Sequence, residues 1–457
     1  MGTRTQRQGR SRAIGAAAVV VALVAAACGG DDDGDAAPTT TAAGPPTTVA
    51  TSAPPTTASA GDAATTAPSA PADDPNLAFP SLAPPEGTPM VVGLVNTEGT
   101  PGLDFPEIRL AVAGTVDYLN EHGGIGGRPV ELVTCTAKGS PETSQACAQE
   151  LVGNDVELVL LGLDLFPDYA TYTAAGVPVV GMLPVLPGDY TTEAARFLTG
   201  GNATVMAAIA KVAAEHFGAS TVGIVSADNP GANSSLAALT AALDQAGITY
   251  EAVKGGDNET DAGFQGLMRE AAQGDPDLLV SLYADAGCIG TMRGRASLGI
   301  DIPVITTGIC ASSEVLDQVG DDALGWSFVG VSTQEETPST EILQAIMAPV
   351  LGVERGEVDS TALGLAALAM PMALTVAVIG NTIGADGGEA TGQAIDERLG
   401  SSDELTSWPG DVPMQCGASS AYPAVCGFVF PVAEYREGGE VTTIPGLDAV
   451  SVLDSLP

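Results

Sequence analysis

The chain is poor in basic residues. Lys and Arg together number 16 among 457 residues, against 56 Asp and Glu, so the formal net charge is −40. A surface this acidic repels nucleic-acid phosphates and anionic lipid headgroups. We therefore expect no nucleic-acid partner, and we interpret the charge as a solvated acidic surface that keeps an exported protein soluble.

Histidine is almost absent, with His122 and His216 as the two examples. A Ser–His–Asp site needs a histidine beside a nucleophile, and zinc sites need clustered Cys or His ligands. His122 adjoins a glycine-rich turn, His216 adjoins Phe217, and no Cys-x-x-Cys, G-x-S-x-G or phosphate-binding glycine loop occurs. The sequence predicts no catalytic residue, no metal and no cofactor, so we do not expect an enzyme.

The first 28 residues have the layout of an export signal. Four arginines between Arg4 and Arg12 precede an apolar run from Ala13 to Ala27, and Cys28 follows. The ending "AAAC" resembles a lipoprotein signal, in which Cys28 is acylated and becomes the new N-terminus. This predicts an extracytoplasmic protein that is lipid-anchored to the outer face of the cell membrane. Ordinary secretion with cleavage nearby is the alternative.

Residues 29–88 lack large aliphatic and aromatic side chains until Leu77 and Phe79, and they are rich in Pro, Thr and Ala. Such a composition cannot bury enough apolar surface to offset chain entropy. We predict a disordered tether between the anchor and a folded body.

Six cysteines remain once Cys28 is set aside, and an even number in an exported chain indicates disulfides. Six cysteines permit many pairings. Their clustering along the chain favours three bridges, namely Cys135–Cys147, Cys288–Cys310 and Cys416–Cys426.

Short, continuously apolar stretches alternate with helical stretches from Met90 onward, which is typical of parallel sheets covered on both faces. A helix is expected at about 203–217. The predicted strands are 90–95, 129–134, 156–162, 177–182, 221–226, 248–253, 277–283 and 302–307. The length and this repeated pattern predict an α/β protein with two Rossmann-like lobes.

The stretch "NEHGGIGGRPVELVTC", residues 120–135, joins a helix to a strand through four glycines. Gly123 or Gly124 can take the left-handed conformation that closes a helix, and Gly126–Gly127 allow the chain to fold back. Ser140 is a natural N-cap for the next helix, with Pro141 at its first position. The helix before the glycine-rich turn is expected to bury one face, formed by Phe105, Ile108, Val112, Val116 and Leu119.

Residues 361–380 are nearly uncharged and long enough to span a membrane. Pro371 at the centre and the scarcity of flanking basic residues oppose a span. A span would also place Cys416 and Cys426 on a reducing side of the membrane. We predict a buried interior helix.

Together these stretches resemble the type 1 periplasmic binding proteins, in particular the Leu/Ile/Val-binding group that serves ABC importers. The resemblance runs from about Val91 to Val432 and is carried by "VVGLVNTEG", "AVAGTVDYLNEHGGIGGRPVELVTC", "SPETSQACAQELV", "VPVVGM" and "TVGIVSADNPGANSSLAALTAALDQAGI". It implies two hinged lobes, with crossings near Gly200, Val331 and Met414. Lobe 1 would hold 89–200 and 332–414, and lobe 2 would hold 201–331 and 415–457.

Ligands of open parallel sheets sit beyond the carboxyl ends of the strands. The candidate ligand-binding residues at these ends are Asn96, Thr97, Glu98, Asp164, Phe166, Met182, Leu183, Asp228, Asn229, Tyr283, Asp285, Thr307 and Gly308. The alternative for Asp164, Asp228 and Asp285 is helix capping, and for Tyr283 it is strand-end packing.

The loops after the third and fourth strands read "GLDLFPDY" and "GMLPVLPG". Members that bind amino acids place small hydroxyl residues there to hold the carboxylate, and this chain has none. Four acidic candidates, Glu98, Asp164, Asp228 and Asp285, would suit an amine or a polyol, with Phe166, Leu183 and Tyr283 packing its apolar part.

The leading interpretation is a solute-binding lipoprotein of an ABC importer, capturing a small polar or amphiphilic molecule. Its expected partners are a small-molecule ligand and an ABC permease, with membrane contact through the lipid anchor alone, and we expect a monomer. A ligand-sensing lipoprotein of the same fold is the alternative, and a secreted hydrolase is the third.

Overall fold

The computed structural model describes residues 84–100, 103–331, 338–401, 405–408, 412–447 and 449–456. The predicted signal of residues 1–28, including Cys28, and the predicted tether up to residue 83 lie outside these residues.

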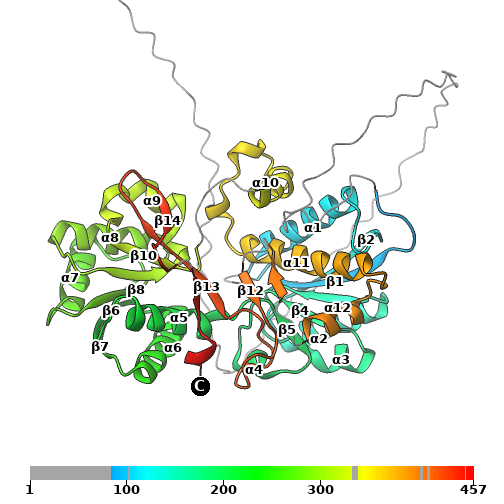
Figure 1. Cartoon of the computed structure of the whole chain (residues 1–457), viewed down its shortest axis with the longest axis horizontal. Helices are drawn as coiled ribbons and strands as arrows, with labels where there is room; N and C mark the ends of the chain where they lie inside the picture. The colour runs from blue at the N-terminus through cyan, green and yellow to red at the C-terminus, as the bar shows by residue number, and fades with distance from the viewer. Residues whose placement is uncertain are drawn as a thin grey trace, which may run out of the picture.

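Two separate sheets organise the chain, the first parallel and the second mixed, and they lie side by side in Figure 1. We call them, with their helices, the first half and the second half. The first sheet has the order β2-β1-β3-β4-β5. Its strands are β1 (Met90–Thr97), β2 (Val130–Ala137), β3 (Leu158–Leu161), β4 (Val179–Gly181) and β5 (Ala195–Phe197).

The second sheet has the order β14-β13-β10-β9-β8-β6-β7, with β15 pairing with β13. Its β13, β14 and β15 are antiparallel to their partners, and the others run parallel. The strands are β6 (Thr221–Ala227), β7 (Thr249–Gly255), β8 (Leu278–Leu282), β9 (Val304–Thr307), β10 (Trp326–Val329), β13 (Val429–Tyr435), β14 (Val441–Thr443) and β15 (Ala449–Ser451).

Helices cover both faces of the first sheet, as the continuously apolar strands require. One apolar cluster joins Val92 and Leu94 to α1, α11 and α12, and another joins Val95 and Val159 to α2 and α3. The helices of this half are α1 (Pro106–Glu121), α2 (Pro141–Gly153), α3 (Tyr169–Ala175), α4 (Pro187–Thr191), α10 (Pro338–Leu351), α11 (Ala366–Ala385) and α12 (Gly392–Leu399). A separate hairpin is formed by β11 (Leu405–Ser407) and β12 (Val412–Met414).

The second sheet is covered in the same way. Val222 and Ile224 face α5 and α6, whereas Val225 and Leu279 face α7, α8 and α9. These helices are α5 (Gly201–Glu215), α6 (Pro230–Ala246), α7 (Asp261–Ala271), α8 (Ala286–Leu298) and α9 (Ser313–Val319). Short 3-10 turns are η2 (Gly308–Ala311), η3 (Gly320–Ala323), η4 (Arg355–Glu357), η5 (Ser360–Ala362) and η6 (Leu453–Ser455). The predicted α/β class with two helix-wrapped sheets is confirmed; the first sheet is parallel, and the second adds three antiparallel strands to a parallel core.

All four glycines of the turn after α1 have positive φ, at 98° for Gly123, 71° for Gly124, 59° for Gly126 and 81° for Gly127. A Cβ on Gly124 would lie 1.9 Å from the carbonyl oxygen of Arg128. The turn therefore needs glycine, and it returns the chain so that β2 pairs in parallel with β1.

Helix α11 is the one helix in the described part of the chain that is long and apolar enough to cross a membrane. It packs against α1 and α12, and Met370, Leu374 and Ala377 are fully buried there. It is an interior helix of the first half, as predicted.

The three predicted disulfides are all present, joining Cys135 to Cys147, Cys288 to Cys310 and Cys416 to Cys426. The first joins β2 to α2, and the second joins the first turn of α8 to η2.

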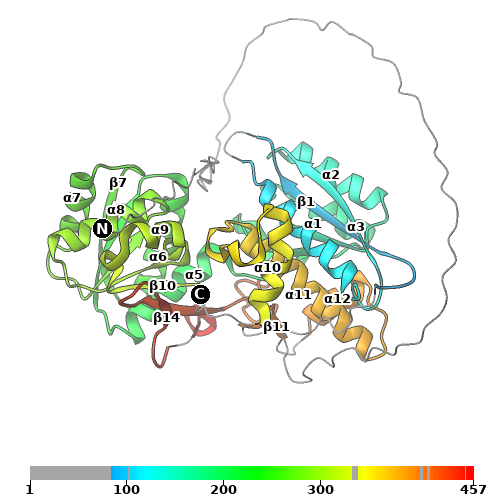
Figure 2. The same cartoon turned by 90° about the horizontal axis from the view of Figure 1, so that it is seen from above.

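The chain passes between the halves three times, after β5, after β10 and before β13. Figure 2 shows the two halves from above, with α5 and α10 near the middle of the molecule. Val425 pairs in parallel with Phe197 of β5, so the last passage lies near Gly427. From the sequence we expect this last passage near Met414. The sequence does not reveal that residues 424–426 continue beside the first sheet.

Candidate ligand-binding site

A cavity of about 980 Å³ lies between the two halves. Gly200, Gly330 and Gly427, which belong to the three connections, contribute to its lining. The loops after β4, β8 and β9 open into it, so the cavity sits beyond the carboxyl ends of strands from both sheets.

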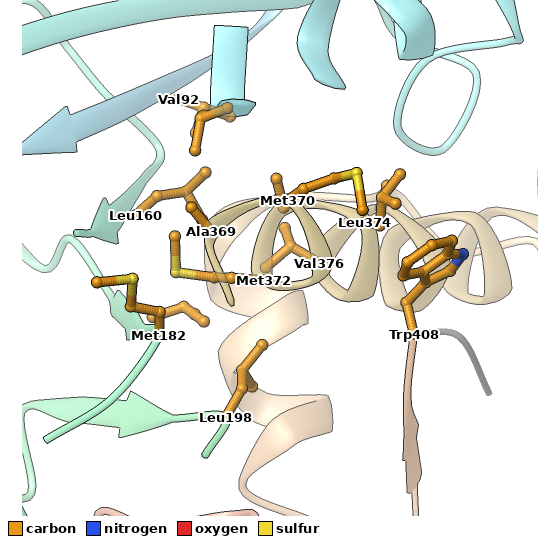
Figure 3. Packing of buried hydrophobic residues seen from close by; sticks show 14 of the residues in the cluster. Val92, Leu160, Met182, Leu198, Ala369, Met370, Met372, Leu374, Val376 and Trp408 are labelled. Carbon is orange, nitrogen blue, oxygen red and sulfur yellow. The ribbon is translucent and has the colours of Figure 1, made fainter. Parts of the chain in front are cut away.

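The wall from the first half is apolar. Met182 and Leu183 follow β4, Pro371 and Met372 come from α11, and Trp408 follows the first strand of the hairpin. Figure 3 shows Met182 and Met372 facing one another at α11, and Trp408 beside the same helix but carried by a separate strand. This wall suits a hydrocarbon or aromatic surface.

Hydroxyl groups on the same wall are engaged with the protein. Thr199 Oγ1 donates to the carbonyl oxygen of Met182 at 2.7 Å, and Ser407 Oγ donates to the carbonyl oxygen of Val412 at 3.3 Å. Thr375 Oγ1 accepts from the Trp408 backbone N–H at 2.8 Å. These contacts hold the hairpin and the β4 loop in place.

The wall from the second half is more polar, and Asn229 is fixed within it. Its Oδ1 accepts from the N–H of Ala232 at 2.8 Å and so caps α6, while its Nδ2 donates to Asp257 Oδ1 at 2.5 Å. Thr307 at the end of β9 also lines the cavity. Asn229 is therefore a rigid polar element of the wall.

Asp285 precedes α8 and lines the cavity. Its backbone has φ 44° and ψ −116°, and its side chain makes no capping hydrogen bond to the helix. Such strain is unusual outside glycine and clusters at binding sites. Burial raises the pKa of its carboxyl, and the nearby Glu314 adds to this effect.

Tyr283 lies beneath this wall at 4% exposure. Its ring packs edge-on against Phe264 with centroids 5.5 Å apart, and a Cβ on Gly287 would lie 2.2 Å from it. Burial raises the pKa of its hydroxyl, and the charges of Glu259 and Asp257 add to this. The close fit fixes the β8–α8 loop that carries Asp285.

Six of the residues predicted for binding line this cavity, namely Met182, Leu183, Asn229, Tyr283, Asp285 and Thr307. The others, Asn96, Thr97, Glu98, Asp164, Phe166, Asp228 and Gly308, are not among its lining residues.

Partners within the protein account for several of the residues outside the lining. Asn96 Nδ2 donates to the carbonyl oxygen of Phe105 at 2.7 Å, and its Oδ1 accepts from the N–H of Leu163 at 3.1 Å. Glu98 pairs with Arg109 of α1 at 2.9 Å. Both side chains thus fix the loop after β1 to its neighbours, beside the fully buried Thr97.

Asp164 is buried and accepts hydrogen bonds from the Ser144 hydroxyl at 2.6 Å and the Phe166 N–H at 3.0 Å. Burial raises the pKa of its carboxyl despite these bonds. Phe166 itself is 41% exposed. The acidic residues predicted in the first half therefore do not form a polar receptor in the cavity.

In the second half, Asp228 accepts from Asn233 Nδ2 at 3.2 Å. A Cβ on Gly308 would lie 2.4 Å from the Val331 side chain, so that position faces the protein. Two carboxylates, those of Asp257 and Asp285, remain in the described lining, and no Lys, Arg or His accompanies them.

Sequence reasoning missed Trp408, Pro371 and Tyr190 as lining residues. The apolar length of α11 indicates burial but not which side faces a cavity. Trp408 lies beside a hairpin of two three-residue strands, too short to leave a periodic pattern.

Neither histidine belongs to the cavity lining. His122 stacks on Tyr118 with ring centroids 3.9 Å apart, and His216 meets Phe217 edge-on at 4.9 Å. In the part of the chain that the structure describes, no group of three or more His, Cys, Asp or Glu could hold a metal ion.

Two helix-wrapped sheets, joined three times and enclosing a cavity, define a class of solute-binding proteins. The sequence model of the periplasmic binding protein family matches residues 89–405. The chain belongs to this family, as its sequence resemblance predicts, and solved structures of branched-chain amino acid binding proteins share its fold. Its general role is therefore solute binding outside the cytoplasm.

Solved structures show the same fold at low identity. An ABC transporter substrate-binding protein from Sphaerobacter thermophilus is 21% identical with a TM-score of 0.61, covering 80% of this chain and 99% of its own. An R. palustris solute-binding protein in complex with 4-hydroxybenzoate is 19% identical with a TM-score of 0.54, covering 79% and 97%.

A branched-chain amino acid transporter substrate-binding protein from Streptococcus pneumoniae, in complex with isoleucine, is 17% identical with a TM-score of 0.53, covering 78% of this chain and 99% of its own. At these identities the likeness shows the fold alone. No curated protein matches the chain.

Proposed function

We propose that this chain is the solute-binding lipoprotein of an ABC importer and captures a small polar or amphiphilic molecule by closure of its two halves. The observation that supports this most is the cavity of about 980 Å³, which takes its walls from both halves and touches all three connections. A solute there would bind both walls at once, and binding would favour the closed arrangement.

The three connections form the hinge in this proposal. Gly427 and Leu198 belong to different connections, and a Cβ on Gly427 would lie 2.4 Å from the carbonyl oxygen of Leu198. The domain boundaries predicted from the sequence, 89–200 with 332–414 and 201–331 with 415–457, are retained as part of the proposal, with the last boundary moved toward Gly427.

Anchoring through Cys28 completes the proposed function. The signal-like residues 1–28 and the tether-like composition of 29–88 support it. A Cys28→Ala variant is expected in the soluble extracellular fraction, whereas the wild-type chain stays with membranes. Equal membrane association of both would contradict the anchor and leave solute binding untouched.

Mass spectrometry of small molecules released from the purified full chain tests solute binding. We expect one species in stoichiometric amount. The variant Ala367→Trp places an indole on the cavity side of α11 and is expected to lose that species. Its matched control, Ala362→Trp, changes an exposed alanine outside the lining and should keep it. Loss from both variants, or no bound species in the wild type, would contradict the proposal.

Uptake of the released species distinguishes transport from sensing. Cells lacking the chain are expected to lose uptake of that solute. Unchanged uptake together with a lost transcriptional response would favour the ligand-sensing lipoprotein instead.

A further inference from the structure

The cavity has no positively charged side chain among its described lining residues, although it carries the carboxylates of Asp257 and Asp285. The whole chain carries a formal net charge of −40. An anionic group entering this space would meet like charges and lose its hydration without a cation to replace it.

Neutral donors could substitute for a cation, but two of the hydroxyl donors on the first-half wall are already engaged. The hydroxyl protons of Thr199 and Ser407 are donated to backbone carbonyl oxygens. The neighbouring lining side chains of Leu183, Leu368 and Pro371 have no polar atoms. Trp408 Nε1 is buried without a hydrogen-bond partner among the described residues, so this wall offers a carboxylate one indole N–H among mostly apolar side chains and no cation.

Helix N-termini are the other common anion receptors. At α6, the first residue is Pro230, which has no N–H, and the N–H of Ala232 donates to Asn229 Oδ1. At α8, the N–H groups of Gly287 and Cys288 both donate to the carbonyl oxygen of Ala284, at 2.9 and 3.4 Å. The two helix ends beside Asn229 and Asp285 are thus largely satisfied within the protein.

The opposite chemistry fits the same space. Asp285 has a strained backbone and a side chain free of any capping bond, and it faces a cavity whose far wall carries Trp408, Met372 and Pro371. A cationic group would gain charge-assisted hydrogen bonds at Asp285, while an apolar body would cover the far wall. The acidic surface would also favour the approach of a cation.

We propose that the ligand is an amine with a bulky apolar body and no carboxylate, whose ammonium binds at Asp285 and whose apolar part lies against the wall of α11 and Trp408. This inference rests on the proposed solute-binding function and narrows it to one ligand class. It excludes free α-amino acids and aromatic acids as the preferred solutes of this chain.

Pairs of probes that differ in the carboxylate test the inference. After extensive dialysis, the full chain is titrated calorimetrically with tryptophan and tryptamine, phenylalanine and 2-phenylethylamine, and leucine and 3-methylbutylamine, with 4-hydroxybenzoate as an aromatic acid. We expect each amine to bind at least about tenfold more tightly than its amino acid. Tryptamine should bind more tightly than 3-methylbutylamine because it covers more of the apolar wall.

Two variants with matched controls connect the selectivity to the wall residues. Leu368→Lys brings an ammonium into the lining and should weaken amine binding while strengthening 4-hydroxybenzoate binding. Leu351→Lys makes the same change at a leucine that is 50% exposed on α10 and outside the lining, and it should change neither. Asp285→Asn should weaken amine binding about tenfold, whereas Asp317→Asn on α9 should not.

Tighter binding of any amino acid than of its amine, or no binding of any amine, would overturn the inference. Equal effects of Leu368→Lys and Leu351→Lys would also overturn it. The solute-binding proposal is tested separately, because a stoichiometric species released from the full chain would support it even if that species carried a carboxylate.

Discussion

The disulfide between Cys288 and Cys310 should matter for both stability and the cavity. It joins the first turn of α8 to η2, and both sulfur-bearing residues are fully buried. Residues on each side of it, Asp285 and Thr307, line the cavity. The double variant Cys288→Ala/Cys310→Ala removes the bridge without leaving buried hydroxyl groups.

The expected loss of stability follows from the length of the closed loop. The two cysteines are 22 residues apart, and the chain-entropy model gives about 3 kcal/mol for a loop of this size. Urea unfolding of the variant should show this loss. Hydrogen exchange should also be faster at residues 284–288 and 307–311, because the loops that the bridge holds together gain freedom.

The bridge between Cys135 and Cys147 is a matched control, since it closes a loop of 12 residues between β2 and α2, away from the cavity lining. Its removal should cost a similar free energy of unfolding, about 3 kcal/mol, and leave exchange at 284–288 and 307–311 unchanged. If both double variants gave the same exchange in these segments, the positioning role of the Cys288–Cys310 bridge would be refuted.

Two further predictions concern local structure. A non-glycine residue in the left-handed conformation costs roughly 1–2 kcal/mol. Gly124→Ala should destabilise the protein by more than this, because its Cβ meets a backbone oxygen, whereas Gly127→Ala, with φ 81° and open space, should cost only about this amount. Thermal unfolding of the two variants compares their stabilities. Asp277 accepts hydrogen bonds from Ser220 and Thr221, which lower the pKa of its carboxyl from 3.8 to about 2. The ionised carboxylate of Asp277 therefore stabilises the fold at pH values above its ordinary pKa. Asp277→Asn should be less stable than wild type at pH 7, and this difference in stability should shrink as the pH falls toward 2. A constant difference from pH 7 to pH 2 would contradict this assignment.

Much of the fold could be predicted from local patterns. Continuous apolar runs such as "VELVLLG" indicated buried parallel strands, and the Ser140–Pro141 pair indicated a helix start that the structure shows with its capping bonds. The short strand β5, with sequence "ARF", was missed because three residues carry no periodicity. β5 belongs to the sheet because it pairs with its neighbours, whereas its own sequence does not identify it as a strand.

The candidate site could be predicted only in part, because strand ends locate loops but not the partners of their side chains. Glu98 and Asp164 follow strands as the rule requires, yet Arg109 and Ser144 on two different helices contact them. Residues of α11, far along the chain, line the cavity where Glu98 and Asp164 were expected. Such pairings are decided by tertiary packing, which one sequence does not display.

The most direct test of the account is a crystal structure of the full chain with the solute that it retains on purification. We predict a single molecule in the cavity, touching Asp285 from one half and Trp408 from the other, with the two halves closer together than in the solute-free protein. A molecule bound elsewhere, or one that contacts a single half and leaves the separation of the halves unchanged, would contradict the account.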